Sequence, residues 1–86
     1  MSGAVKKKIK DYILNEFLPG EDPDELTDTT PLITGGIIDS IGTLKLVMFL
    51  EEEYKVKFAP HEIDRDKLDT LAGIVNVVMS KNPKVA

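Results

Sequence analysis

The feature that most constrains the fold is an apolar run that begins directly after a glycine-containing turn. The sequence GGIIDSIGTLKLVMFLEEEY occupies residues 35–54, and within its LKLVMFL portion only Lys45 is polar. Apolar residues this dense predict a helix that is central to the domain or that presents an apolar patch to a partner. We therefore expect a helix over 40–54, with Asp39 or Ser40 as its N-cap.

Apolar periodicity predicts two further main helices, over 3–18 and over 70–80, because apolar residues recur there every three or four positions. The stripe of the first comprises Val5, Ile9, Tyr12, Ile13 and Phe17, and that of the last comprises Leu71, Ile74, Val75 and Val78. A short helix is predicted over 60–66, since Pro60 suits a first helical turn. The sequence YKVKF at 54–58 alternates like a strand but has no second strand to pair with, so we expect an extended connection.

A long connection, 19–38, separates the first two helices. Compact domains rarely carry a structureless loop of this length, so we expect it to serve the function or to contain a short element. Its apolar residues should pack it onto the core. They are Leu26, Leu32, Ile33, Ile37 and Ile38. The predicted fold is all-α: one domain over 1–86, a small four-helix bundle of three main helices and one short helix, with the long loop between helices one and two.

Composition narrows the possible functions. The 86 residues contain no cysteine and carry a formal net charge of −4. Without cysteine there are no disulfides or thiolate ligands, so any thiol chemistry has to come from a cofactor. The acidic balance argues against nucleic-acid binding and suits partners with basic docking patches. No apolar run is long enough to span a bilayer and no secretory signal is evident, so we expect a cytoplasmic protein.

Three groups of residues have simple explanations that need no special chemistry. The acidic residues of 21–28 lack the glycine and the terminal glutamate of an EF-hand loop, so we expect a solvated loop and no metal site. His61 is the only histidine and is expected to be a solvated surface residue. The lysines of the first helix are too few and too local for nucleic acid and are expected to form a solvated helix face.

Ser40 is the principal candidate for a functional residue. It lies where the glycine-containing loop turns into the central helix, and a helix N-terminus favours anions. On the local sequence alone, a helix cap is the more economical interpretation of Ser40. Ser40, Leu44 and Met48 are spaced four residues apart, so they share one face of the helix.

The pattern as a whole resembles the acyl carrier protein and peptidyl carrier protein family. The residues that carry the resemblance are Asp39-Ser40-Ile41, the LxLVMFLEEEY that follows, Thr30-Pro31-Leu32 in the loop, and DxLDTLAGIV at 66–75. They span nearly the whole domain in the family's helix order. In that family the serine of a D-S-L/I/M motif carries 4′-phosphopantetheine. The resemblance implies that Ser40 is the attachment residue, that Asp39 flanks it, and that a phosphopantetheinyl transferase adds the arm from coenzyme A.

The resemblance implies a carrier protein that is not itself an enzyme. Such a protein holds an acyl or aminoacyl group as a thioester and presents it to enzymes of a fatty acid, polyketide, nonribosomal peptide or other specialised biosynthetic pathway. The implied partners are the transferase, an acyl- or aminoacyl-loading ligase, and downstream acyl-transfer or condensing enzymes, and a monomer is the simplest form. Docking should be weak and electrostatic so that partners can exchange. The expected partner surface comprises Leu44, Lys45, Met48, Glu51 and Glu52.

Within the family, the motifs are closest to the D-alanyl and stand-alone aminoacyl carrier proteins. GIIDSIGTLKL and EIDRDKLDT are similar to their G-L-L-D-S-x-G-T-x-x-L and F-D-R-D-x-x-x-T patterns. The fatty-acid-synthesis type has an acid where this chain has Gly42 and a glutamate where it has Lys45. Both differences remove negative charge from the start of the docking helix, which favours a dedicated ligase and acceptor.

Two functions of other classes remain open on the sequence. A cofactor-free helical interaction module would need no exposed serine and would tolerate Ser40→Ala. A small enzyme with Ser40 as its nucleophile would need a nearby base, for which His61 is the only candidate, and so small a bundle offers little room for a substrate cleft.

Overall fold

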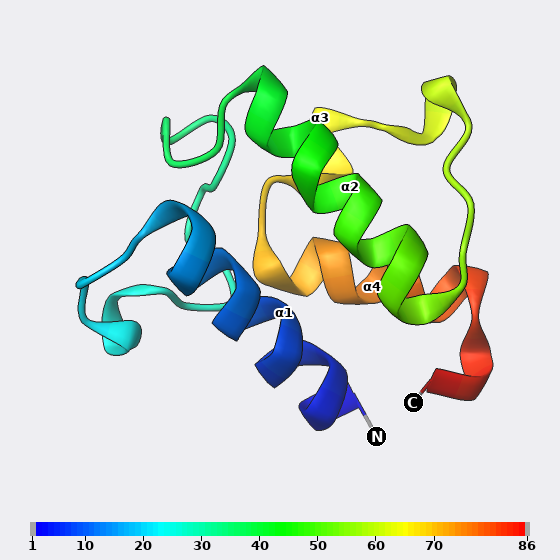
Figure 1. Ribbon diagram of the computed structural model, residues 1–86, viewed down its shortest axis with the longest axis horizontal. Helices are drawn as coiled ribbons and strands as arrows, with labels where there is room; N and C mark the ends of the chain where they lie inside the picture. Colours follow the sequence, from blue (N-terminus) through cyan, green and yellow to red (C-terminus); the bar gives the residue numbers. More distant parts are fainter. Residues whose placement is uncertain (1, 86) are drawn as a thin grey trace.

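The computed structural model describes residues 2–85, and over that range the chain consists of helices joined by loops (Figure 1). In chain order the elements are α1 (Ser2–Phe17), the 3-10 turn η1 (Pro23–Glu25), α2 (Ser40–Tyr54), the 3-10 turn η2 (Pro60–Glu62), α3 (Arg65–Leu68), α4 (Leu71–Lys81) and the 3-10 turn η3 (Pro83–Val85). The predicted all-α bundle is confirmed, with α1, α2 and α4 as the main helices and α3 as the short one.

The three main helices begin and end within a residue or two of the predicted positions, and side chains cap the starts of α2 and α4. Asp39 is the N-cap of α2, and its Oδ1 accepts a hydrogen bond from the Gly42 N–H at 2.6 Å. Thr70 caps α4 in the same way, accepting from the Gly73 N–H at 3.0 Å. These bonds satisfy backbone donors that have no partner inside the helix, which fixes the residue at which each helix starts.

The prediction of one short helix over 60–66 is wrong in its boundaries. Residues Pro60–Glu62 form a single 3-10 turn, and the short helix begins only at Arg65. The break occurs because the Asp64 side chain accepts from the Asp66 N–H at 2.9 Å and so caps a new helix. A short polar side chain that bonds the backbone ahead of it competes with continuation of the preceding turn.

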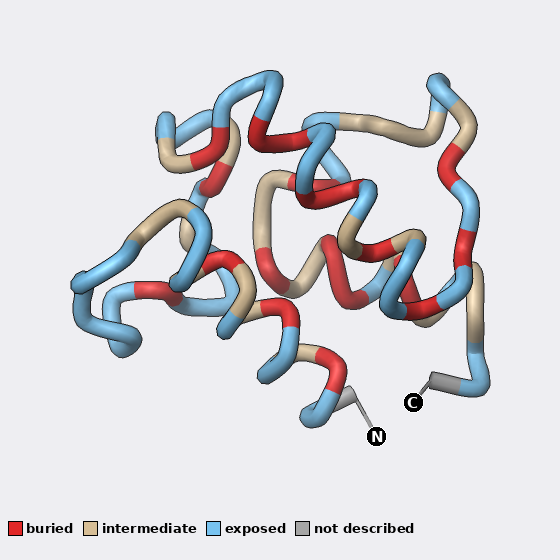
Figure 2. Tube along the Cα trace, in the orientation of Figure 1, coloured by how far each residue is buried: buried red, intermediate tan, exposed pale blue. Residues whose placement is uncertain are grey.

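The core lies where α1, α2 and α4 meet, and Figure 2 shows the buried stretches on the sides of the helices that face one another. The largest fully buried side chains are Ile9, Ile13, Leu32, Ile38, Leu46, Leu50, Leu68, Leu71, Ile74 and Val78. The predicted stripe of α4 is buried throughout, whereas in the stripe of α1 Tyr12 and Phe17 are only half-buried. Tyr12 instead stacks on Phe49 of α2, with ring centroids 4.0 Å apart, and so joins α1 to α2.

The loop between α1 and α2 contains the short element η1 and is packed as predicted. Leu26, Leu32 and Ile38 are buried, and Ile33 and Ile37 are half-buried against the core. Backbone hydrogen bonds also tie the loop to the turn between α3 and α4, since the Leu32 N–H donates to the Asp69 carbonyl at 2.6 Å. The loop is therefore packed as part of the bundle, and it holds in place the segment that leads to the start of α2.

After α2 the chain returns beside that helix as an extended segment and reaches α3 near the first half of α2 (Figure 1). Val56 and Phe58 of this segment are buried. The extended connection expected over 54–58 begins only at Val56, because Tyr54 is the last residue of α2 and Lys55 is in the left-handed conformation. The Phe58 N–H donates to the Glu51 Oε2 at 2.8 Å, so a side chain of α2 takes the place of a neighbouring strand. The described residues 2–85 include no helix that has the length and apolar character needed to cross a bilayer.

Candidate functional site around Ser40

Ser40 is the first residue of α2, and it is exposed. The sequence left open whether Asp39 or Ser40 caps the helix, and the structure assigns the cap to Asp39. Asp39 also accepts at its backbone carbonyl from the Thr43 N–H and Oγ1, at 2.8 Å and 2.9 Å. The Ser40 hydroxyl makes no hydrogen bond to any other residue that the structure describes, so it stands at the helix N-terminus available for chemistry.

A cavity of about 380 Å³ opens beside Ser40. Its lining comprises Ile33, Gly36, Ile38, Asp39, Ser40, Thr43, Leu44, Ile63 and Arg65. Three parts of the chain meet here: the end of the long loop, the first turns of α2, and the entry to α3. The walls are largely apolar, and a modified serine side chain would lie against them. The sequence pointed to Ser40, Asp39 and Leu44, but it did not place Ile63 and Arg65 beside them.

Asp69 holds the loop wall of this cavity in place. Its Oδ1 accepts from the N–H groups of Ile33 and Thr34 at 2.7 Å and 2.8 Å, and its Oδ2 accepts from the Thr34 hydroxyl at 2.8 Å. These hydrogen bonds, first those from the Thr34 backbone and side chain, lower the pKa of Asp69. The late motif DxLDT, which includes Asp69, therefore fixes the geometry of the loop that leads to the serine.

The exposed face of α2 next to Ser40 is apolar. Leu44 and Met48 are 52% and 66% exposed, as their spacing from Ser40 indicated. Ile41 is 68% exposed and belongs to the same surface, although it was not among the predicted surface residues. Its spacing of four residues from Lys45 and seven from Met48 is the signal that identifies it. Large apolar side chains gathered on one exposed helix face are typical of a protein interaction site.

The three charged residues predicted for the partner surface have different environments. Lys45 is exposed, with its Nζ 3.9 Å from the Glu16 Oε1 of α1, and Glu52 is exposed at the other end of α2. Glu51 is half-buried and its carboxylate is occupied by the Phe58 N–H, so it serves to hold the extended segment. At 1.5 Å per residue, Glu52 lies about 18 Å along the helix from Ser40.

The structure does not bring His61 to Ser40. His61 lies exposed in η2, as expected for a solvated residue, and it does not line the cavity beside the serine. In the loop, Asp22 caps η1 by accepting from the Asp24 N–H at 2.9 Å, and Asp28 pairs with Lys6 at 3.2 Å. Among residues 2–85, no group of three or more acidic or histidine side chains is placed to hold a metal ion.

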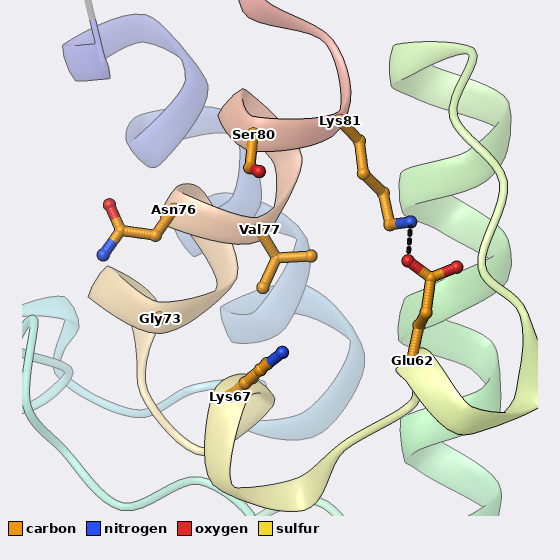
Figure 3. A pocket seen from close by; sticks show the side chains of 7 residues that line it. All are labelled: Glu62, Lys67, Gly73, Asn76, Val77, Ser80 and Lys81. Atoms are coloured by element: carbon orange, nitrogen blue, oxygen red, sulfur yellow. Dashed lines mark hydrogen bonds and ion pairs between the residues drawn. The ribbon is translucent and has the colours of Figure 1, made fainter.

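A second cavity of about 380 Å³ lies between α3 and α4, lined by Glu62, Lys67, Gly73, Asn76, Val77, Ser80 and Lys81 (Figure 3). It shares no lining residue with the cavity beside Ser40. The Glu62 carboxylate accepts from the Lys81 ammonium at 2.5 Å, which lowers the pKa of Glu62. Figure 3 shows this pair bridging η2 and α4, so two of the charges at this cavity are occupied within the domain.

No protein-family model matches the chain. Several curated relatives do, among them three carrier proteins. The "Probable acyl carrier protein PigG" of Serratia sp. (strain ATCC 39006) is 35% identical over 74 residues, covering 86% of this chain and 84% of that protein. The "Acyl carrier protein" of Bdellovibrio bacteriovorus is 32% identical over 78 residues, covering 91% and 95%. A "D-alanyl carrier protein" of Streptococcus pyogenes serotype M1 is 36% identical over 58 residues, covering 67% and 72%. With these relatives and this all-helical fold, the chain belongs to the acyl carrier protein family and is a carrier protein.

Proposed function

We propose that this protein carries an acyl or aminoacyl group as a thioester on a 4′-phosphopantetheine arm attached to Ser40. The observation that carries the proposal is the exposure of the Ser40 hydroxyl at the start of α2, with the capping role taken by Asp39. A serine that caps nothing and is paired with no described residue has no structural task at this position. Its placement agrees with the attachment residue of the family.

The surroundings of Ser40 fit a phosphate-linked group. The N-terminus of a helix favours a negative charge, and Ser40 is the first residue of the 15-residue helix α2. The neighbouring cavity offers apolar walls from Ile33, Ile38 and Leu44 for the part of the arm near the phosphate. The arm supplies the thiol that forms the thioester, a group that this cysteine-free chain lacks.

Attachment requires only the nucleophilic oxygen from this chain. The Ser40 Oγ forms a bond to the phosphorus of coenzyme A that bears the pantetheine, while the pyrophosphate P–O bond breaks and the nucleotide leaves. The hydroxyl proton passes to a base on the phosphopantetheinyl transferase. No general base from this chain is invoked, and His61 has no part in the step.

The partner enzymes are proposed to dock on the exposed face of α2, which we define as Ile41, Leu44, Lys45, Met48 and Glu52. The face combines apolar area near Ser40 with charges that suit weak, exchangeable complexes. Its partners would be the transferase, a loading ligase of acyl or aminoacyl groups, and the enzymes that accept the group. Because coenzyme A is the donor of the arm, we infer that the protein works in the cytoplasm.

The test is the intact mass after incubation with coenzyme A and a broad-specificity phosphopantetheinyl transferase. The wild type should gain one phosphopantetheinyl group, Ser40→Ala should gain none, and Ser80→Ala should gain one. Ser80 is a matched control because it is also exposed but lies on α4 at the second cavity. If the wild type gains nothing while a control carrier is modified, the cofactor-free interaction module becomes the leading function.

A further inference from the structure

We infer that Arg65 contacts the phosphodiester formed on Ser40, and that it positions the start of the arm along α2. The inference rests on the proposed attachment at Ser40 and concerns a residue far from it in the sequence. Ser40 and Arg65 line the same cavity, with Ile63 beside Arg65 and Leu44 beside Ser40. The arm begins at a serine whose neighbouring wall therefore contains a guanidinium group.

Arg65 is the only basic residue among those that line this cavity, in a chain whose net charge is −4. The only acidic residue in the lining is Asp39, and its carboxylate accepts from the Gly42 N–H at 2.6 Å. A phosphodiester on Ser40 would add a negative charge next to that acid. The phosphodiester and the Asp39 carboxylate would repel each other, and a cation in the cavity would offset that repulsion.

Arg65 lines the cavity without a direct ion pair to any described residue, although Asp69 is near enough for the positive charge of Arg65 to contribute to its lowered pKa. In the described part of the chain, none of the ion pairs within 4.0 Å includes Arg65. The acids near it in sequence have other tasks, since Asp64 accepts from the Asp66 N–H and Asp69 accepts from Ile33 and Thr34. The guanidinium is thus held near the serine by the start of α3, with its hydrogen-bond donors available to a new anion.

Arginine suits this task better than lysine does. Its planar guanidinium can donate two parallel hydrogen bonds to the two non-bridging oxygens of a phosphodiester. The α2 N-terminus favours the same charge from the other side. Ser40 and Arg65 are both exposed, so the attraction would act in contact with solvent and should weaken as salt is added.

Lys67 provides a matched control. It lies on α3, as Arg65 does, and it is exposed. Figure 3 shows its side chain at the second cavity, on the side of α4, and Lys67 is not among the residues that line the cavity beside Ser40. Arg65→Gln and Lys67→Gln each remove one positive charge from the same short helix, so they change the net charge of the protein equally.

The experiment is ³¹P nuclear magnetic resonance on the isolated protein carrying the arm, at low salt, for the wild type, Arg65→Gln, Arg65→Lys and Lys67→Gln. The same proteins unfolded in urea give the reference shift of an uncontacted phosphodiester. Arg65→Gln should move the ³¹P resonance toward that reference, Arg65→Lys should move it part of the way, and Lys67→Gln should leave it in place. The initial rate of modification should fall about two- to fivefold in Arg65→Gln, as for one exposed ion pair, and the difference should shrink with salt.

The inference is overturned if Arg65→Gln leaves the ³¹P resonance where it is in the wild type, or if Lys67→Gln shifts it equally. Arg65→Lys serves as the second test variant if Arg65→Gln is not modified, and an unchanged resonance in Arg65→Lys would then count against the contact. Failure of the proposed function has a different signature, because the wild type itself would take up no arm. A modified wild type with an insensitive phosphorus contradicts only the role of Arg65.

Discussion

Gly42 shows at the scale of one residue how a motif position can also be a packing requirement. The sequence comparison identified it as the place where this chain lacks an acid. In the structure Gly42 is buried, and a Cβ there would lie 2.7 Å from the Phe17 Cε1 and 3.1 Å from the Asp39 Oδ1. The close approach of α1 to the start of α2 therefore also requires a glycine, independently of any partner.

We expect Gly42→Ala to destabilise the protein by about 1–3 kcal/mol, because the Phe17 ring must move to admit the methyl group. Urea unfolding followed by circular dichroism measures the change. Gly3→Ala is the control, since it also lies in a helix but has no heavy atom within 4 Å of the added Cβ. Equal stability of Gly42→Ala and wild type would show that the α1–α2 contact adapts to the side chain.

Asp69 gives a prediction about pH. Its ordinary pKa is near 3.8, and hydrogen bonds from Thr34 and Ile33 lower the pKa in the folded protein. A lowered pKa in the folded state means that the stabilisation is complete above the unfolded value and is lost as the pH falls through the folded value. We expect Asp69→Asn to have a lower free energy of unfolding than wild type at neutral pH. The difference in this free energy between the two proteins should narrow as the pH falls below about 3.8.

The measurement is the urea midpoint of both proteins between neutral pH and the acid limit of the native state. Comparing the two proteins isolates Asp69, because Glu62, whose pKa is also lowered, contributes equally to both. A difference in midpoint that stays constant through the acid range would assign the effect to something other than the carboxylate charge.

At the scale of the element, neighbouring glutamates of α2 have different roles. Glu51 holds the extended segment through the Phe58 N–H, whereas Glu52 is exposed on the α2 face. We expect Glu51→Ala to cost about 1–3 kcal/mol, since it leaves a half-buried backbone donor without its acceptor. Glu52→Ala should change stability by less than about 0.5 kcal/mol and should act instead on partner docking.

Thermal unfolding of the two variants, together with the rate at which a loading ligase charges each of them, separates the roles. Reduced charging of Glu52→Ala with unchanged stability supports the α2 face as the docking surface. If Glu51→Ala is as stable as wild type, Phe58 does not depend on that side chain.

At the scale of the whole molecule, the kind of cargo should affect the midpoint of thermal unfolding. The side chains of the core are fully enclosed, and the cavity beside Ser40 is open to solvent at a serine that is exposed. An aminoacyl group has little apolar surface to bury, so we expect it to change the midpoint of thermal unfolding by less than about 1 °C. A long acyl chain would gain stability by entering apolar space, as any ligand that binds only the folded state does.

Differential scanning calorimetry of the protein with the arm alone, with an aminoacyl group and with a fatty acyl group provides the comparison. A rise in the midpoint on aminoacyl loading would show that the bundle encloses this cargo. The same scans test the prediction of a single domain over 1–86, which requires one cooperative transition.

The sequence by itself determined the elements whose signals are local. Helix periodicity placed α1, α2 and α4. The residue types at the start of α2 narrowed its cap to Asp39 or Ser40, and the structure assigns that cap to Asp39. The same periodicity predicted that Ser40, Leu44 and Met48 share a helix face, because they are four residues apart. The structure shows that this face is exposed. The resemblance to a family then added a role for Ser40 that no local pattern could provide.

Only the tertiary structure decided which distant residues meet at the serine. Arg65 and Ile63 reach the cavity because the extended segment returns along α2, and Asp69 bonds a loop residue 36 positions away. The role of Glu51 likewise depends on its side chain bonding the Phe58 N–H of the extended segment. The split of 60–66, by contrast, has a local cause that the sequence analysis missed, since Asp64 caps the Asp66 N–H two residues on. The meeting of the distant residues follows from the packing of the whole core, whose contacts join segments that have no pattern in common, so it cannot be inferred from the spacing of residues within any one segment.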